Sequence, residues 1–140
     1  MRVRKLAEIL KVTPDTVRYY TRIGFLSPEK NSVNGYKEYS QNDHQHLRFI
    51  LSARQLGFSV SDIGQILNEA KNGRTACPIV RRIMEQRLDE TEQLFQQTLE
   101  LRSLMLSAID DWQHKPNKEP TGHMICDLIE GVGGTAVRER

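Results

Sequence analysis

The chain has 140 residues, of which 38% are hydrophobic and 27% charged, enough for one small domain with an appended element. No apolar run approaches the length of a membrane span, and the N-terminus lacks the apolar block of a signal peptide, so we expect a cytoplasmic protein without a membrane partner. The net charge of +2 is unevenly divided, because residues 1–58 hold 10 Lys and Arg against 5 Asp and Glu, giving +5, whereas residues 59–140 hold 10 against 13, giving −3.

The basic half, whose charge suits a surface that faces phosphates, opens with two short predicted helices. Apolar side chains over about residues 5–10 give the first helix a buried face. The second runs from about residue 14 to residue 23, because Thr13 is a good N-cap, Pro14 is tolerated at the first helical position, and Gly24 breaks the helix. Two helices joined by a short turn predict a helix-turn-helix.

A wing and two more helices are predicted to follow. Residues 27–40 hold two asparagines, a proline and a glycine, which indicates a hairpin with a tight turn near Asn34-Gly35. Ser40 and Ser59 read as N-caps of the next two helices, since each has an aspartate three residues later. Apolar residues repeat at helical spacing in both helices, including Leu47, Ile50, Leu51 and Leu56 in the first and Ile63, Ile66 and Leu67 in the second.

Four motifs occur in a fixed order in this half of the chain. They are Thr16-Val17-Arg18-Tyr19-Tyr20, Gly24-Phe25-Leu26, Pro28-Glu29-Lys30 and Gly35-Tyr36-Lys37-Glu38-Tyr39. The string resembles the DNA-binding region of the MerR family of bacterial transcription regulators, which reads T-x-R-Y-Y-E, G-L-L, P-x-R and G-Y-R-x-Y. Thr21 stands where the family usually has Glu, and Lys30 and Lys37 stand where arginine is common.

These motifs supply the predicted DNA-contacting residues. A helix N-terminus with arginine and hydroxyl groups suits phosphates and major-groove base edges, and lysines suit phosphates. For Tyr20 and Tyr39 a place in the core and a phosphate contact are equally open, whereas for Tyr19 and Tyr36 we favour DNA. The predicted set is Thr16, Arg18, Tyr19, Tyr20, Lys30, Tyr36, Lys37 and Tyr39.

A single long helix is predicted over residues 78–112, which hold no glycine and no proline after Pro78. A narrow apolar stripe of coiled-coil type follows from residues spaced three, four or seven apart, namely Val80, Met84, Leu88, Thr91, Phe95, Thr98, Met105, Ile109 and Trp112. One small domain cannot bury such a seam, so we expect a homodimer; the alternative is a helix folded back on its own core. The MerR resemblance implies an antiparallel dimerisation helix.

The two cysteines lie in the acidic half and neither belongs to a CxxC pair, so no disulfide or zinc knuckle is expected. Cys77 precedes Pro78 and is predicted to be the N-cap of the long helix, where the positive helix end favours the thiolate that binds metals or reacts. The resemblance implies a ligand for divalent heavy metals at this place. The alternative is a small buried cysteine.

The segment after the long helix is the second half of the predicted effector site. Cys126-Asp127-Leu128-Ile129-Glu130 resembles the C-x-[IL]-I-E ending of the family's metal-binding loop, with His123 three residues earlier and His114 nearer the start. Thiolates with imidazole suit zinc, cadmium or lead. Most metal sensors of the family carry another cysteine early in this loop, where this chain has histidine, asparagine and glutamate. Either a histidine replaces it or the site holds no metal.

The expected fold is mostly α: a winged helix-turn-helix over 1–73, an antiparallel coiled-coil dimerisation helix over 74–112, an effector loop over 113–131 and a disordered tail over 132–140. The resemblance implies a homodimeric regulator that binds double-stranded promoter DNA and distorts it for RNA polymerase, in response to a divalent metal ion such as zinc, cadmium or lead.

Two other functions stay open. The same fold could sense oxidants or electrophiles through Cys77 or Cys126. An architectural DNA-bending protein of excisionase type is disfavoured, because it needs neither a long helix nor paired cysteines. An enzyme is not expected, since the sequence has no Gly-rich phosphate loop, nucleophile elbow or HExxH motif.

Overall fold

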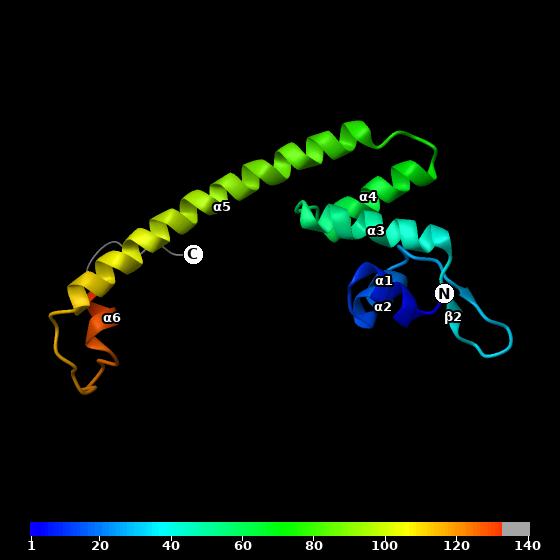
Figure 1. Cartoon of the computed structure of the whole chain (residues 1–140). Helices are drawn as coiled ribbons and strands as arrows, with labels where there is room; N and C mark the ends of the chain where they lie inside the picture. The colour runs from blue at the N-terminus through cyan, green and yellow to red at the C-terminus, as the bar shows by residue number, and fades with distance from the viewer. Residues whose placement is uncertain (133–140) are drawn as a thin grey trace. The chain divides into compact units, whose positions relative to one another are not determined.

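The computed structural model describes residues 1–132 as six helices and one two-stranded hairpin (Figure 1). The elements are α1 Val3–Leu10, α2 Pro14–Arg22, β1 Glu29–Lys30, β2 Lys37–Glu38, α3 Gln41–Gln55, α4 Val60–Lys71, α5 Cys77–Trp112 and α6 Asp127–Val132. The mostly helical class and the helix-turn-helix followed by a long helix are therefore confirmed. None of the described helices is long and apolar enough to cross a membrane.

The predicted helix starts are confirmed by their capping bonds. The Thr13 side-chain oxygen accepts a hydrogen bond from the backbone N–H of Thr16 at 3.2 Å. Ser40 and Ser59 form complete capping boxes, in which each serine hydroxyl accepts from the backbone N–H of the aspartate and that aspartate accepts from the N–H of the serine. Such caps contribute about 1 kcal/mol each, so three helices begin where local chemistry favours it.

The chain divides into two compact units, Met1–Asp89 and the remainder, of which residues 90–132 are described. The first unit has one hydrophobic core, to which α1, α2, α3, α4 and the first turns of α5 contribute. Its fully buried side chains are Leu6, Val17, Leu47, Ile50 and Ile63. Leu56 shares the helical spacing of Leu47 and Ile50 but is 64% exposed, because it is the C-cap residue where α3 has already ended.

The wing is a short antiparallel ladder in which Glu29 lies opposite Glu38 and Lys30 opposite Lys37. Its connection spans residues 31–36 and is longer than the predicted tight turn, because the Asn31 side-chain oxygen accepts from two backbone N–H groups inside it. Gly35 has a φ of +74°, which favours glycine. The backbone of Tyr39 pairs with that of Met1, so the end of the wing is held to the start of the chain.

The second unit contains the C-terminal part of α5, a loop and α6. The Trp112 indole N–H donates to the Leu128 carbonyl at 3.1 Å, which joins the end of α5 to α6. Ion pairs of Lys115 with Asp111 at 2.9 Å and of Lys118 with Asp127 at 3.5 Å hold the loop from both sides. Val132 is the last residue of α6, and the rest of the expected tail, residues 133–140, lies outside the described residues.

Candidate nucleic-acid interface and effector segments

The second helix of the helix-turn-helix, α2, presents Thr16 and Arg18. The Thr16 hydroxyl lies 2.9 Å from that of Thr13, so it belongs to the cap. The Arg18 side chain is 57% exposed and bonds to Asp15 at 2.9 Å. An exposed ion pair of this kind is worth little in water, so Arg18 can exchange Asp15 for a base edge or phosphate at small cost.

Two of the four predicted tyrosines are on the surface. Tyr19 is 37% exposed with the Arg22 guanidinium 5.5 Å from its ring centroid, and Tyr36 is 57% exposed with Arg2 at 4.4 Å. Cation–π contacts hold these arginines beside the exposed rings. Arg2 and Arg22 were absent from the predicted set, although their positive charge in the basic half was a signal for both. They extend the cationic surface around α2 and the wing.

The other two tyrosines are in the core, which is one of the two interpretations left open for them. Tyr20 is 6% exposed and stacks on Phe25, with the two ring centroids 6.2 Å apart. Tyr39 is 3% exposed. The Thr21 hydroxyl donates to the Val17 carbonyl, so in its 2.7 Å bond with Tyr39 the tyrosine hydroxyl is the donor. A phosphate contact by Tyr39 would have to break that bond, and DNA contacts by both residues stay predictions.

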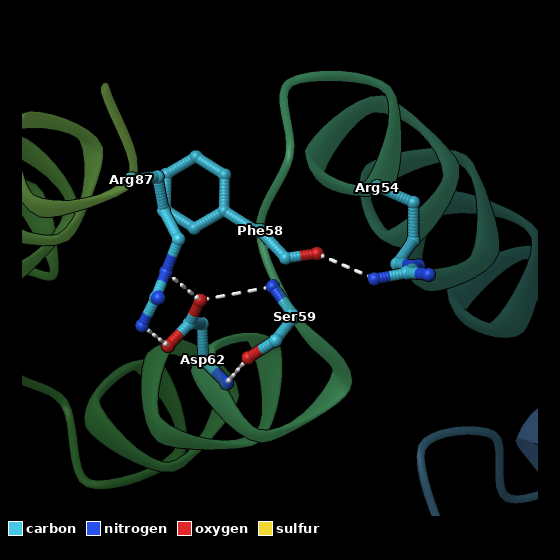
Figure 2. A network of polar contacts seen from close by, with 5 residues as sticks. All are labelled: Arg54, Phe58, Ser59, Asp62 and Arg87. Atoms are coloured by element: carbon cyan, nitrogen blue, oxygen red, sulfur yellow. Dashed lines mark hydrogen bonds and ion pairs between the residues drawn. The ribbon is translucent and has the colours of Figure 1, made fainter. Parts of the chain in front are cut away.

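A polar network joins the start of α4 to α5 (Figure 2). The Asp62 carboxylate accepts from the Ser59 backbone N–H at 2.9 Å and from two nitrogens of Arg87 at 2.9 and 3.2 Å. Arg54, on α3, donates to the Phe58 carbonyl at 2.8 Å in the same turn. Burial raises the pKa of the Asp62 carboxyl, but the bonds from Ser59 and Arg87 outweigh it, so this pKa lies below its ordinary value.

Cys77 is exposed and is the first residue of α5. Its predicted place as N-cap is one residue wrong, because the Ala76 carbonyl accepts the first helical bond, from the Val80 N–H at 2.9 Å. The Cys77 backbone N–H bonds to the Thr75 hydroxyl at 3.3 Å. In the single chain the thiol is exposed and does not belong to the core.

Cys126 is partly buried and directly precedes α6. Its carbonyl accepts from the Glu130 N–H, and one Glu130 carboxylate oxygen accepts from the N–H groups of Ile125 and Cys126 at 3.0 and 2.9 Å. His114 and His123 are exposed. Within residues 1–132 of one chain, no three His, Cys, Asp or Glu side chains lie close enough together to hold a metal ion.

The chain matches two family models. Residues 1–70 match the one described as MerR HTH family regulatory protein, and residues 45–108 match the one described as MerR, DNA binding. Together they cover the helix-turn-helix, the wing, α3, α4 and most of α5.

Curated relatives and solved structures agree with these matches. The chain is 37% identical over 92 residues to the transcriptional regulator ZntR of Escherichia coli, a match that covers 65% of either chain. It is 34% identical over 132 residues to HmrR of Rhizobium leguminosarum, covering 94% of this chain and all of the relative. The regulator PbrR691 of Ralstonia metallidurans, solved in complex with lead(II), matches with a TM-score of 0.65 at 22% identity, over 94% of this chain and 98% of that one. At that identity the likeness shows the fold.

Proposed function

This chain belongs to the MerR family of DNA-binding transcription regulators and is not an enzyme, and from that premise we propose that it is a homodimeric, metal-responsive activator. It would act in the cytoplasm on a double-stranded promoter. The observation that carries the DNA-binding part is the exposed basic and aromatic surface formed by α2 and the wing.

We assign the DNA contacts to the residues that this surface exposes. Arg18 would read base edges, with Thr16 beside it at the N-terminus of α2. Tyr19, Tyr36, Lys30 and Lys37 would contact phosphates. Tyr20 and Tyr39 would support the surface from the core, in keeping with their burial.

The exposed apolar seam of α5 supports the proposed dimer. Leu88, Phe95, Met105 and Ile109 recur on α5 and are each more than half exposed in the single chain. An apolar stripe of this length calls for a partner helix, and a second copy offers the same stripe. We propose that two α5 helices pair antiparallel and place two α2 helices on the two half-sites of one operator.

The donor atoms of the effector segments fit a soft or borderline divalent ion, and zinc, cadmium and lead are the candidates. One chain does not gather three donors within its described residues, so the set would be completed by a dimer. Cys126 and His123 of one copy, with His114 as a further candidate, would hold the ion together with Cys77 of the other. A bound ion would link the two copies through thiolate and imidazole bonds.

The proposed output is a change in promoter shape. Two α2 helices in a dimer bind their half-sites jointly. Any change in the position of one copy relative to the other would therefore deform the DNA between the half-sites. Deformation of that DNA would bring the promoter elements into the spacing that RNA polymerase needs.

In vitro selection of duplex DNA by the purified protein, followed by a transcription assay on the selected operator, tests this proposal. We expect transcription to rise with zinc, cadmium or lead and to fall when a chelator is added. A response to peroxide or aldehyde in chelated, metal-free protein would replace the metal by an oxidant or electrophile acting on Cys77 or Cys126. Bending without any effector response would support the architectural alternative.

A further inference from the structure

The wing pairs like charges on both of its rungs. Glu29 lies opposite Glu38, and Lys30 lies opposite Lys37. Side chains directly opposite each other in an antiparallel ladder lie on the same face and close together, and like charges there destabilise the pairing. Successive rungs alternate between faces, so this two-rung ladder has one face with two lysines and another with two glutamates.

The base of the wing is joined to α2. Tyr39 is two residues from Lys37, and its hydroxyl bonds to Thr21 of α2 at 2.7 Å. The two glutamates line a hollow together with Tyr39 and with Asp43 of α3. The two lysines therefore belong to a hairpin whose base is bonded to the helix that we propose reads the operator.

Both lysines are exposed, and within residues 1–132 neither ammonium forms a hydrogen bond or an ion pair. Two opposed ammonium groups repel each other unless an anion lies between them. A phosphate oxygen carries the opposite charge and can accept from both.

We propose that Lys30 and Lys37 clamp one phosphate of the DNA backbone between them, and that this phosphate removes the repulsion between the two ammonium groups in the free wing. The proposal rests on the proposed DNA-binding function and adds a regulation to it. The paired wing would be more stable on DNA than in the free protein, so wing order and operator binding would be coupled.

The backbone N–H of Asn31 reports the pairing, because it donates to the Tyr36 carbonyl at 2.7 Å across the base of the wing connection. Its hydrogen exchange is measured by NMR in the full-length protein, free and with the selected operator. We expect exchange to slow by at least about tenfold on DNA. Inorganic phosphate should not reproduce this; equal protection by inorganic phosphate would overturn the assignment to the DNA backbone.

Lys30→Glu separates the two halves of the proposal, because it makes the lysine rung an opposite-charge pair. In the free protein, exchange at Asn31 should slow by about two- to fivefold, whereas operator binding should weaken. Glu29→Gln is the matched control: it removes one charge from the other rung, where Glu38 is already paired with the N-terminal ammonium at 3.5 Å, so exchange should slow less and operator binding should be kept. If exchange at Asn31 in free Lys30→Glu is as fast as in wild type, repulsion between the two lysines does not destabilise the wing and the proposal fails.

Salt dependence shows whether the lysines share one phosphate. Lys30→Gln and Lys37→Gln should each change the slope of log K against log salt little, because the other lysine still neutralises the phosphate. In the double variant, the magnitude of this slope should decrease by about 0.9 per protomer. Losses of about 0.9 for each single variant and about 1.8 for the double would show two separate phosphates and reject the clamp. Wild-type protein that binds no duplex would instead reject the proposed function itself.

Discussion

Asp62 and Arg87 join the start of α4 to α5 by a two-point ion pair, with Nε to Oδ2 at 2.9 Å and Nη2 to Oδ1 at 3.2 Å. Asp62 also closes the capping box of α4 with Ser59, so one carboxylate both begins a helix and holds α5. The Asp62 side chain is 9% exposed and that of Arg87 29%, which makes the pair less screened by solvent than a surface pair. Any rotation of α5 relative to α4 would have to stretch these hydrogen bonds.

Arg87→Met should therefore lower the free energy of unfolding by about 2 kcal/mol, because it keeps the length of the side chain but leaves a partly buried carboxylate without its charged donor. Urea denaturation followed by circular dichroism measures this. Arg74→Met is the control, since Arg74 forms an exposed two-point pair with Glu69 and its loss should cost much less. Equal decreases in the free energy of unfolding of the two variants would show that the Asp62–Arg87 pair stabilises the fold no more than an exposed ion pair does.

Acid should remove the contribution of Asp62. Its pKa in the folded protein lies below the ordinary value of 3.8, because the Ser59 and Arg87 bonds outweigh the effect of burial. A carboxyl with a depressed folded pKa adds stability that is fully present above the unfolded pKa and is lost as the pH falls through the folded one. The difference in unfolding free energy between wild type and Asp62→Asn should thus stay constant down to about pH 5 and shrink below 3.8. Urea titrations at a series of pH values test this, and a gap that shrinks toward high pH would refute it.

Arg18→Ala should weaken binding to the selected operator by about 1–3 kcal/mol and relax the preference for operator over random duplex. Fluorescence anisotropy at fixed salt measures both quantities. Asp15→Ala is the control, because it frees Arg18 from its 2.9 Å ion pair and should keep or tighten binding. If Arg18→Ala discriminates as well as wild type, α2 does not read the operator through this residue.

Local features of this fold could be predicted from the sequence, because each depends on a few neighbouring residues. Thr13, Ser40 and Ser59 cap their helices as expected. Cys77 was misplaced by one residue because proline is tolerated at both of the first helical positions, so Pro78 leaves the start of α5 open. The wing connection was predicted too short because Asn31 bonds within it through its side chain.

Long-range pairs were not predictable in the same way. Asp62 and Arg87 are 25 residues apart, and Thr21 and Tyr39 are 18 apart. The residues around each member of these pairs do not predict the other member, because such pairs depend on the packing of whole helices. The burial of Tyr20 and Tyr39 was left open for the same reason: a tyrosine at helical or strand spacing suits both a core and a phosphate contact.

Phe95→Glu should convert the protein to a monomer and abolish operator binding, because the dimer would have to bury an unpaired carboxylate in its apolar seam and a monomer reads one half-site only. Sedimentation at micromolar concentration measures the mass. Gln96→Glu adds the same charge on the same turn but on the polar face that holds Glu92 and Glu100, so it should remain dimeric. Wild-type protein that sediments as a monomer would remove the basis of the proposed dimer.

Cys77→Ser should abolish the transcriptional response to zinc, cadmium or lead and leave operator binding intact, because Cys77 opens α5 and is not part of α2 or the wing. His123→Ala should weaken metal binding without eliminating it, since the thiolates of Cys77 and Cys126 would remain as ligands. Isothermal titration with each ion measures affinity. Because thiolate and neutral imidazole are the ligating forms, binding should release protons and weaken as the pH falls.

The same variants separate the metal from a reactive thiol. A thiol sensor should respond to oxidant with chelator present and should depend little on His123, whereas a metal site should lose its response in chelator and depend on both cysteines. Glu130→Gln is a useful control, because it keeps a side-chain oxygen that can accept from the Ile125 and Cys126 N–H groups and should retain most of the metal affinity. A full metal response in Cys77→Ser would show that the ion is held without this thiol, and the proposed ligand set would have to be abandoned.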